Sequence, residues 1–173
     1  MLCIIVIKIK GIAYLNMSCL YQIPLNNKSL PLIYVIMLLP SEIEAKSLIP
    51  AIRAILARKL VAEYHLREEL VAKVLGVTQA AISNYVRGTR GDGELISRLV
   101  SITQVMERID EIAKDLSANK AYTPNTMAKF VELCNYMRYT FLICDIHHSM
   151  ESNIDEQICE QCKGMLTAAA VGR

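Results

Sequence analysis

The sequence predicts an all-α protein, and three observations lead to this fold class. Apolar residues recur at helical spacing over residues 51–64, and a glycine and a threonine lie where one short helix would end and the next begin. Over residues 94–117 the apolar residues follow a heptad. Hydrophobic residues make up 53% of the 173 residues, which is enough for a buried core. We therefore expect packed helices.

The composition also indicates a protein of the cytoplasm. No uncharged apolar run reaches the roughly 18 residues that a membrane span needs, because lysine or proline interrupts the best candidates. No basic stretch precedes the first apolar run, so we expect no secretory signal. In that compartment the six cysteines are expected to be thiols or metal ligands instead of disulfides.

Residues 1–36 differ from the rest of the chain, since they contain three lysines, no acidic residue and no helical period. The alternation over residues 7–10, Ile-Lys-Ile-Lys, is typical of a strand, but no partner strand is evident elsewhere. We therefore expect Met37 to be the natural start and residues 1–36 to be an upstream extension. The alternative is a weakly ordered N-terminal arm.

The first helix is expected to begin at Ser41. Ser41 and Glu44 have the Ser-x-x-Glu spacing of a capping box, in which both side chains satisfy backbone N–H groups at a helix start. Pro50 should kink or restart this helix, which then runs to about Tyr64.

Two short helices should follow, separated by a tight turn. The first covers residues 67–75 and ends at Gly76, because a left-handed backbone at a helix end is cheap only for glycine. Thr78 then caps the second, which covers residues 79–87. The glycine-rich residues 88–93 form the connector that follows.

The longest expected helix spans residues 94–117, within a region of dimerisation or packing that covers 94–142 and includes a further helix at 126–142. Its heptad seam, the kind through which two subunits pair, consists of Leu95, Leu99, Ile102, Met106, Ile109, Ala113 and Leu116. Further apolar residues widen this stripe to the core face of a helical domain, namely Ile96, Val100, Val105 and Ile112. The two interpretations can coexist.

Steric requirements divide residues 71–91 into packing and outward-facing positions. Those that must pack around the turn are Val71, Ala72, Leu75, Gly76, Val77, Ile82 and Tyr85. Those left to face outward are Gln79, Ala80, Ser83, Asn84 and Arg87. Gln and Asn can pair with an adenine edge, Arg reaches guanine or phosphate, Ser suits phosphate, and an Ala methyl can touch thymine. The pattern predicts a DNA-reading helix; the alternative is a helical hairpin with a polar exposed face.

Charge is concentrated on the same stretch, although the formal net charge of the chain is only +2. Residues 53–90 contain seven basic and three acidic side chains, a net of +4, whereas residues 91–116 contain three basic and six acidic ones, a net of −3. The side chains available for DNA phosphates are Arg53, Arg58, Lys59, Lys73 and Arg90.

The stretch AKVLGVTQAAISNYVRGTRG, with the preceding LLPSEIEAKSLIPAIRAILARKLVAEYHLREELV, resembles the Cro/C1-type (XRE) helix-turn-helix domain of a group of short archaeal predicted transcriptional regulators. The resemblance covers about Leu38 to Gly91 and assigns residues 37–93 to this domain. It implies a lambda-repressor-like bundle that binds double-stranded operator DNA, usually as a homodimer, with the third helix in the major groove. The DNA-binding set is then Thr78, Gln79, Ala80, Ser83, Asn84, Arg87 and Arg90.

Residues 143–173 form a cysteine-rich tail with the spacing of a metal site. Cys144-x2-His147 and Cys159-x2-Cys162 are two close ligand pairs separated by a loop, as a tetrahedral zinc site needs. A second set replaces His147 by Cys134, and four thiolates can hold zinc or an iron–sulfur cluster. The alternative is buried apolar thiols. Zinc would be structural, whereas a cluster would sense metal or redox state; the similar archaeal regulators also have cysteine-rich tails.

Three functions compete on this evidence. The first is the sequence-specific regulator, probed by the salt dependence of its DNA binding. A redox or metal-dependent enzyme is disfavoured, because no catalytic triad, paired-carboxylate site or phosphate-binding glycine loop is evident; residues 88–93 lack the Gly-Lys-Ser/Thr ending. We therefore expect no enzyme. The third is an adaptor that binds another protein through a zinc knuckle without reading DNA sequence.

Overall fold

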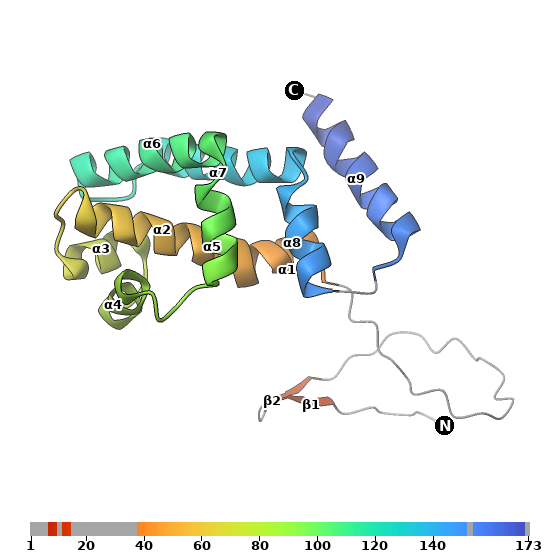
Figure 1. The fold of residues 1–173 in the computed structure, drawn as a ribbon, viewed down its shortest axis with the longest axis horizontal. Helices are drawn as coiled ribbons and strands as arrows, with labels where there is room; N and C mark the ends of the chain where they lie inside the picture. Colours follow the sequence, from red (N-terminus) through yellow and green to blue (C-terminus); the bar gives the residue numbers. More distant parts are fainter. Residues whose placement is uncertain (1–6, 10–11, 15–37, 152–153, 172–173) are drawn as a thin grey trace, which may run out of the picture. The chain divides into compact units, whose positions relative to one another are not determined.

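The computed structural model describes residues 7–9, 12–14, 38–151 and 154–171, and the chain divides into two compact units, 1–34 and 35–173 (Figure 1). In the first unit, β1 (Ile7–Ile9) pairs antiparallel with β2 (Ile12–Tyr14). The expected strand therefore does have a partner, the segment that follows it in the sequence; two strands so close along the chain pair at little entropic cost. The expected start at Met37 lies outside the described residues.

The described residues of the second unit are all-helical, as the sequence predicts. In chain order the helices are α1 (Pro40–Ile43), the π-helix η1 (Glu44–Leu48), α2 (Ile49–Ala62), α3 (Glu68–Leu75), α4 (Gln79–Arg87), α5 (Gly93–Val100), α6 (Thr103–Asn119), α7 (Pro124–Tyr139), α8 (Leu142–Met150) and α9 (Glu156–Val171). In the part of the chain that the structure describes, no helix is both long and apolar enough to cross a bilayer.

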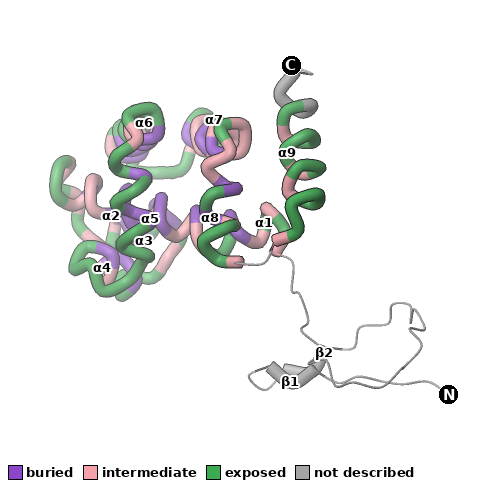
Figure 2. The backbone as a smooth tube through the Cα atoms, turned by 45° about the vertical axis from the view of Figure 1, so that its right-hand side comes forward, coloured by how far each residue is buried: buried purple, intermediate pink, exposed green. Residues whose placement is uncertain are grey.

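Helix α2 lies at the centre of this unit and packs against α3, α4, α5 and α6. In Figure 1, α6 lies above α2, and α3 and α4 lie below it. Figure 2 shows the buried positions along α2 and on the helix faces turned toward it. One cluster of buried side chains extends from Ile43 through Leu56 and Leu116 to Ile146. The helices bearing the expected DNA contacts and the cysteine-bearing α8 therefore share a core.

The expected capping box at Ser41 is wrong. The chain enters the helix one residue earlier, at Pro40, whose fixed φ and missing N–H suit the first helical position. The third helical residue is then Glu42, whose carboxylate accepts a 3.0 Å hydrogen bond from the N–H of Leu39. Glu44 is instead buried and forms an ion pair with Arg138 of α7.

The restart expected at Pro50 takes the form of the π-helix η1, which passes directly into α2. A proline ring clashes with the carbonyl four residues earlier, here that of Lys46, and offers no N–H to it. The wider π turn over residues 44–48 provides the room, so the helix continues into α2.

The single long helix expected over residues 94–117 is also wrong, because α5 and α6 are separate. Ile102 is extended between them (φ −97°, ψ 105°), and the hydroxyl of Ser101 donates to the carbonyl of Arg98 at 2.7 Å. A straight helix of 24 residues would extend about 36 Å in one direction. The break places both halves on the same core.

The heptad seam is consequently used within the chain. Its buried members are Leu95, Leu99, Ile109, Ala113 and Leu116, and they lie beside the buried Ile96, Val105 and Ile112. This is the core-face interpretation of the stripe.

The C-terminal segment is helical where it is described, and its first helix belongs to the core. The chain leaves α7 after Tyr139 and turns at Phe141, which has a positive φ of 58°. Helix α8 then buries Ile143, Cys144 and Ile146.

Candidate nucleic-acid interface

The turn between α3 and α4 is closed by backbone hydrogen bonds around a left-handed glycine. Gly76 has a φ of +64°, the N–H of Val77 donates to the carbonyl of Ala72 at 3.0 Å, and the N–H of Gly76 donates to that of Lys73 at 3.4 Å. This is the Schellman pattern of a helix end. A Cβ on Gly76 would meet no atom within 4 Å, so glycine is required here only for its backbone conformation.

Both ends of α4 are anchored. At its start the hydroxyl oxygen of Thr78 accepts a hydrogen bond from the N–H of Ala81 at 3.2 Å, so the expected cap is confirmed. At its end Gly88 is left-handed (φ +75°), and the Nε of Arg58 on α2 donates to the carbonyl of Tyr85 at 2.8 Å. Arg58, expected to contact phosphate, therefore holds α4 against α2.

The two faces of α4 differ sharply in burial. Its inner face consists of the buried Ala81, Ile82 and Tyr85, whereas Gln79, Ala80 and Arg87 are exposed and Ser83 and Asn84 are half-buried. The cap residue Thr78 and the following Arg90 are exposed as well. Within the described residues, the side-chain amide of Gln79 and the hydroxyl of Ser83 make no hydrogen bond. They are available to a ligand.

Asn84 and the arginines of this segment have contacts within the chain. The Oδ1 of Asn84 accepts a 3.3 Å hydrogen bond from the hydroxyl of Thr89; because an amide oxygen has two lone pairs, it can keep this bond while the amide pairs with an adenine edge. The Nε of Arg87 donates to the carbonyl of Ser83 at 3.2 Å. The guanidinium of Arg90 lies 5.6 Å from the ring centroid of Tyr85.

The basic side chains are not equally available to phosphates. Lys59 is held by Asp110 at 2.8 Å and Glu63 at 2.9 Å, and its side chain is 15% exposed. Burial lowers the pKa of Lys59, but the hydrogen bonds to Asp110 and Glu63 outweigh that effect and raise it. Burial raises the pKa of the Tyr122 phenol, and Arg53 lowers it by a smaller amount, so Arg53 lies near the loop that follows α6. Lys73 is exposed on α3.

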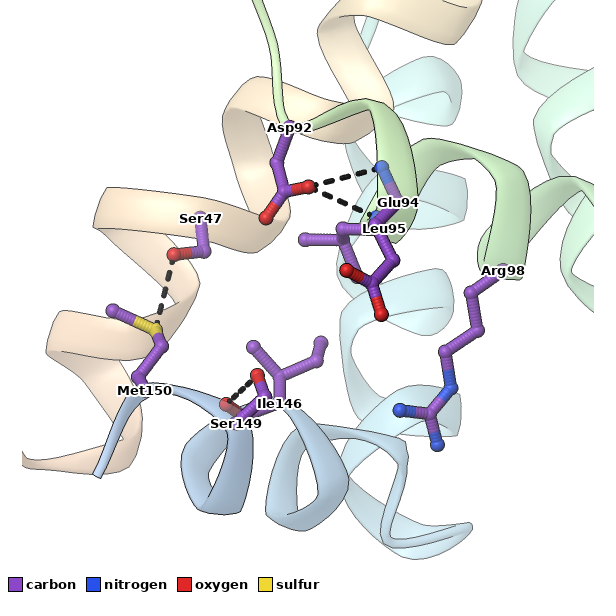
Figure 3. A pocket seen from close by; sticks show the side chains of 8 residues that line it. All are labelled: Ser47, Asp92, Glu94, Leu95, Arg98, Ile146, Ser149 and Met150. Carbon is purple, nitrogen blue, oxygen red and sulfur yellow. Dashed lines mark hydrogen bonds between the residues drawn. The ribbon is translucent and has the colours of Figure 1, made fainter. Parts of the chain in front are cut away.

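A cavity of about 210 Å³ lies where η1, the start of α5 and α8 meet (Figure 3). The Oδ1 of Asp92 caps α5 by accepting from the N–H groups of Glu94 and Leu95, both at 3.1 Å. The hydroxyl of Ser47 donates to the sulfur of Met150 at 3.2 Å. Ser47 thus joins η1 to α8, and Arg98 joins α5 to α8 through an ion pair with Asp145, whereas Asp92 bonds within its own helix. No sequence pattern indicated it, because its walls are about 50 residues apart along the chain.

The structure separates Cys134 from the other three expected thiolate ligands. Cys134 lies on α7 near the Glu44–Arg138 pair, where burial and then the Glu44 carboxylate raise its pKa to about 11. Cys144 is buried on α8, and Cys159 and Cys162 are half-buried on α9.

The alternative ligand, His147, has another partner. Its Nε2 lies 2.6 Å from a carboxylate oxygen of Glu151, which also accepts from the N–H of Leu38 at 3.2 Å. In the described ranges, no three His, Cys, Asp or Glu side chains are gathered closely enough to hold a metal ion. The expected zinc or iron–sulfur site stays a prediction. The chain matches no protein-family model, no curated protein and no solved structure.

Proposed function

We propose that this chain is a sequence-specific DNA-binding transcriptional regulator, in which α3 and α4 form a helix-turn-helix and α4 enters the major groove. The observation that carries the proposal is the contrast between the faces of α4. One face is locked into the core by Ile82 and Tyr85, while the other presents Gln79 and Ser83 without hydrogen-bond partners in the described residues. A rigid helix with an unsatisfied polar face suits a groove about 12 Å wide.

Position along α4 distinguishes the roles of its side chains. Gln79 and Ala80 lie at the N-terminal end, the part of a recognition helix that reaches the base edges, where Gln79 can pair with adenine and Ala80 can touch a thymine methyl. Arg87 and Arg90 lie at the other end and suit phosphates. Asn84 can read adenine while its amide oxygen keeps the contact with Thr89, because that oxygen accepts two hydrogen bonds.

A homodimer on a two-fold operator remains part of this proposal. The heptad seam is not its interface, because the seam is buried between α2, α5, α6 and α7. Pairing would therefore use another surface of the chain, such as the exposed apolar residues Met127 and Val131 on α7.

Selection of bound duplexes from a randomised pool, followed by fluorescence anisotropy on the enriched sequence, tests the proposal. Gln79→Ala should weaken binding to that sequence by roughly tenfold, because a base contact contributes about 1–3 kcal/mol and 1.4 kcal/mol is tenfold. Gln104→Ala is the matched control, since Gln104 is an exposed glutamine on α6, on the other side of α2 (Figure 1). It should leave binding unchanged.

Arg90→Ala provides a second comparison. It should weaken binding to all duplexes alike and lower the slope of log affinity against log salt by about 1. Equal affinity of the wild type for every duplex, or equal effects of the Gln79 and Gln104 changes, would overturn sequence reading by α4. A chain that binds no duplex but captures a protein in a zinc-dependent way would support the adaptor instead.

A further inference from the structure

We propose that Cys144 and His148 of α8, with Cys159 and Cys162 of α9, form a zinc site that ties α9 to the rest of the protein. This ligand set differs from both sets that the sequence spacing offers. It excludes Cys134 and His147, and it takes the neighbouring His148 as the imidazole ligand.

The contact between the two helices selects His148. Its Nε2 lies 3.4 Å from the sulfur of Cys159, whereas His147 is turned to Glu151 at 2.6 Å. Cys144 and His148 are four residues apart on one helix and therefore lie on the same side of it. The exposed imidazole of His148 is thus on the side of α8 that faces the α9 thiols.

The thiols lie on the helix sides that meet at this contact. Cys144 is one turn before His148 on α8, and His148 reaches Cys159 on α9. Cys159 and Cys162 are three residues apart on α9, again on one side of the helix. Cys134 takes no part in this group, because its electrostatic neighbours are Glu44 and Arg138.

The donor set suits zinc, which binds thiolate sulfur and neutral imidazole nitrogen in tetrahedral sites. The four groups are not gathered around one point, since no three metal-binding side chains of the described residues lie at ligand distances. Binding therefore requires α9 to close on α8. Each coordinating thiol loses its proton to solvent as the Zn–S bond forms.

Helix α9 has few other contacts that would resist such a movement. Ile158 and Met165 are 46% and 76% exposed, and Leu166 is only partly buried against the core. Among the described residues, the side-chain hydrogen bond that joins α9 to another element is the one between His148 and Cys159. Structural zinc binding supplies much of the folding free energy of small domains, so it can outweigh these contacts.

Titration of the reduced full-length chain with Co²⁺, followed by displacement with Zn²⁺, tests the site. We expect one equivalent to bind with sulfur-to-cobalt charge-transfer and tetrahedral absorption, and Zn²⁺ to abolish both. His148→Ala should weaken binding by more than about a hundredfold, because even changes to residues behind the ligands cost about 10–100-fold. His148 is exposed, so its replacement should not unfold the chain.

The chain offers two matched controls. His147→Ala and Cys134→Ala should retain the spectrum, whereas His148→Ala and Cys144→Ala should lose it; alanine avoids a hydroxyl at the buried Cys144. Zn²⁺ should also protect Cys159 and Cys162 of the wild type from alkylation, a readout that needs no variant.

Absence of saturable binding, or binding that depends on Cys134 or His147 and not on His148, would overturn the site. The visible absorption of a bound iron–sulfur cluster that Zn²⁺ does not displace would also overturn the site.

Discussion

The helix pairs α3–α4 and α8–α9 are held in opposite ways. In α3–α4 the turn at Gly76, the cap at Thr78 and the packing of Ile82 lie within a few residues of one another. In α8–α9 the anchors come from far along the chain: Asp145 forms an ion pair with Arg98, and Glu151 accepts from the N–H of Leu38. Helix α9 itself is largely exposed.

This difference shows that α4 is held rigidly by its own chain, whereas in the proposed zinc site the position of α9 depends on a bound ion. A capped helix with a buried face presents its outer side chains in one arrangement, as base reading needs. Helix α9 packs on α7, meets α8 at one thiol–imidazole contact and is otherwise largely exposed, so it is free to move, as closure around an ion needs. Three changes test the contrast, from the largest expected effect to the smallest.

The largest effect should come from Arg138→Met, which acts on the C-terminal half. The side chain of Glu44 is 8% exposed, so it would be left as a buried carboxylate without its partner. Breaking a buried pair costs about 3–5 kcal/mol, and because Arg138 is itself 36% exposed we expect about 3 kcal/mol in urea unfolding. Hydrogen exchange should accelerate most in α7 and α8 and least in α3 and α4.

The double variant Glu44→Met/Arg138→Met is its control. Replacing both charges by apolar side chains should recover most of the lost stability, because no unpaired carboxylate remains. Equal acceleration of exchange in α3–α4 and α7–α8 would show that the two regions are not separately anchored.

A smaller effect is expected from Gly91→Ala, in the connector that follows α4. Gly91 has a φ of +105°, and a Cβ would lie 2.9 Å from the terminal methyl of Ile96, which is buried in the core. Backbone strain of this kind costs about 1–3 kcal/mol, so we expect a loss of about 2 kcal/mol in the free energy of unfolding. Gly76→Ala, with positive φ but open space, should lose only about 1 kcal/mol. The reverse order would contradict the packing described for this connector.

The last effect, a change with pH that is absent near neutral pH, concerns Cys134, the thiol that the structure separates from the others. Its pKa is raised from 9.0 to about 11, so at pH 8 its thiolate fraction is roughly 100-fold below that of an ordinary thiol. Mass spectrometry should show correspondingly slow alkylation that quickens about tenfold per pH unit up to pH 11. The same residue in the urea-unfolded chain is the control.

The sign of the accompanying stability change follows from the same shift. Because folding raises this pKa, burial of the protonated thiol is favourable below pH 9, and the contribution is lost as the pH rises from 9 to about 11. Rapid alkylation of Cys134 at pH 8 would contradict the burial and the raised pKa of this thiol.

The bounds of α4 could be predicted from the sequence because glycine and threonine act on backbone groups within five residues. The inner and outer faces of α4 followed from helical spacing alone. The same local reasoning failed at Ser41, because a proline beside it moved the start of the helix by one residue. It also did not predict the hydrogen bond from Thr89 to Asn84 or the ion pairs of Lys59 with Glu63 and Asp110. A polar side chain has several possible partners within reach, and the sequence does not select one.

The sequence by itself determined that residues 67–87 form two short helices joined at Gly76 and Thr78, with a polar outer face on 79–87, because those signals are local. Only the tertiary structure decided that residues 94–117 break at Ile102, that Glu44 pairs with Arg138, and that His148 approaches Cys159. Each of these depends on which surface comes to lie opposite. The same heptad can pack against a second copy or against the core of its own chain. The sequence does not show which of two adjacent histidines faces α9, because that depends on how the two helices pack.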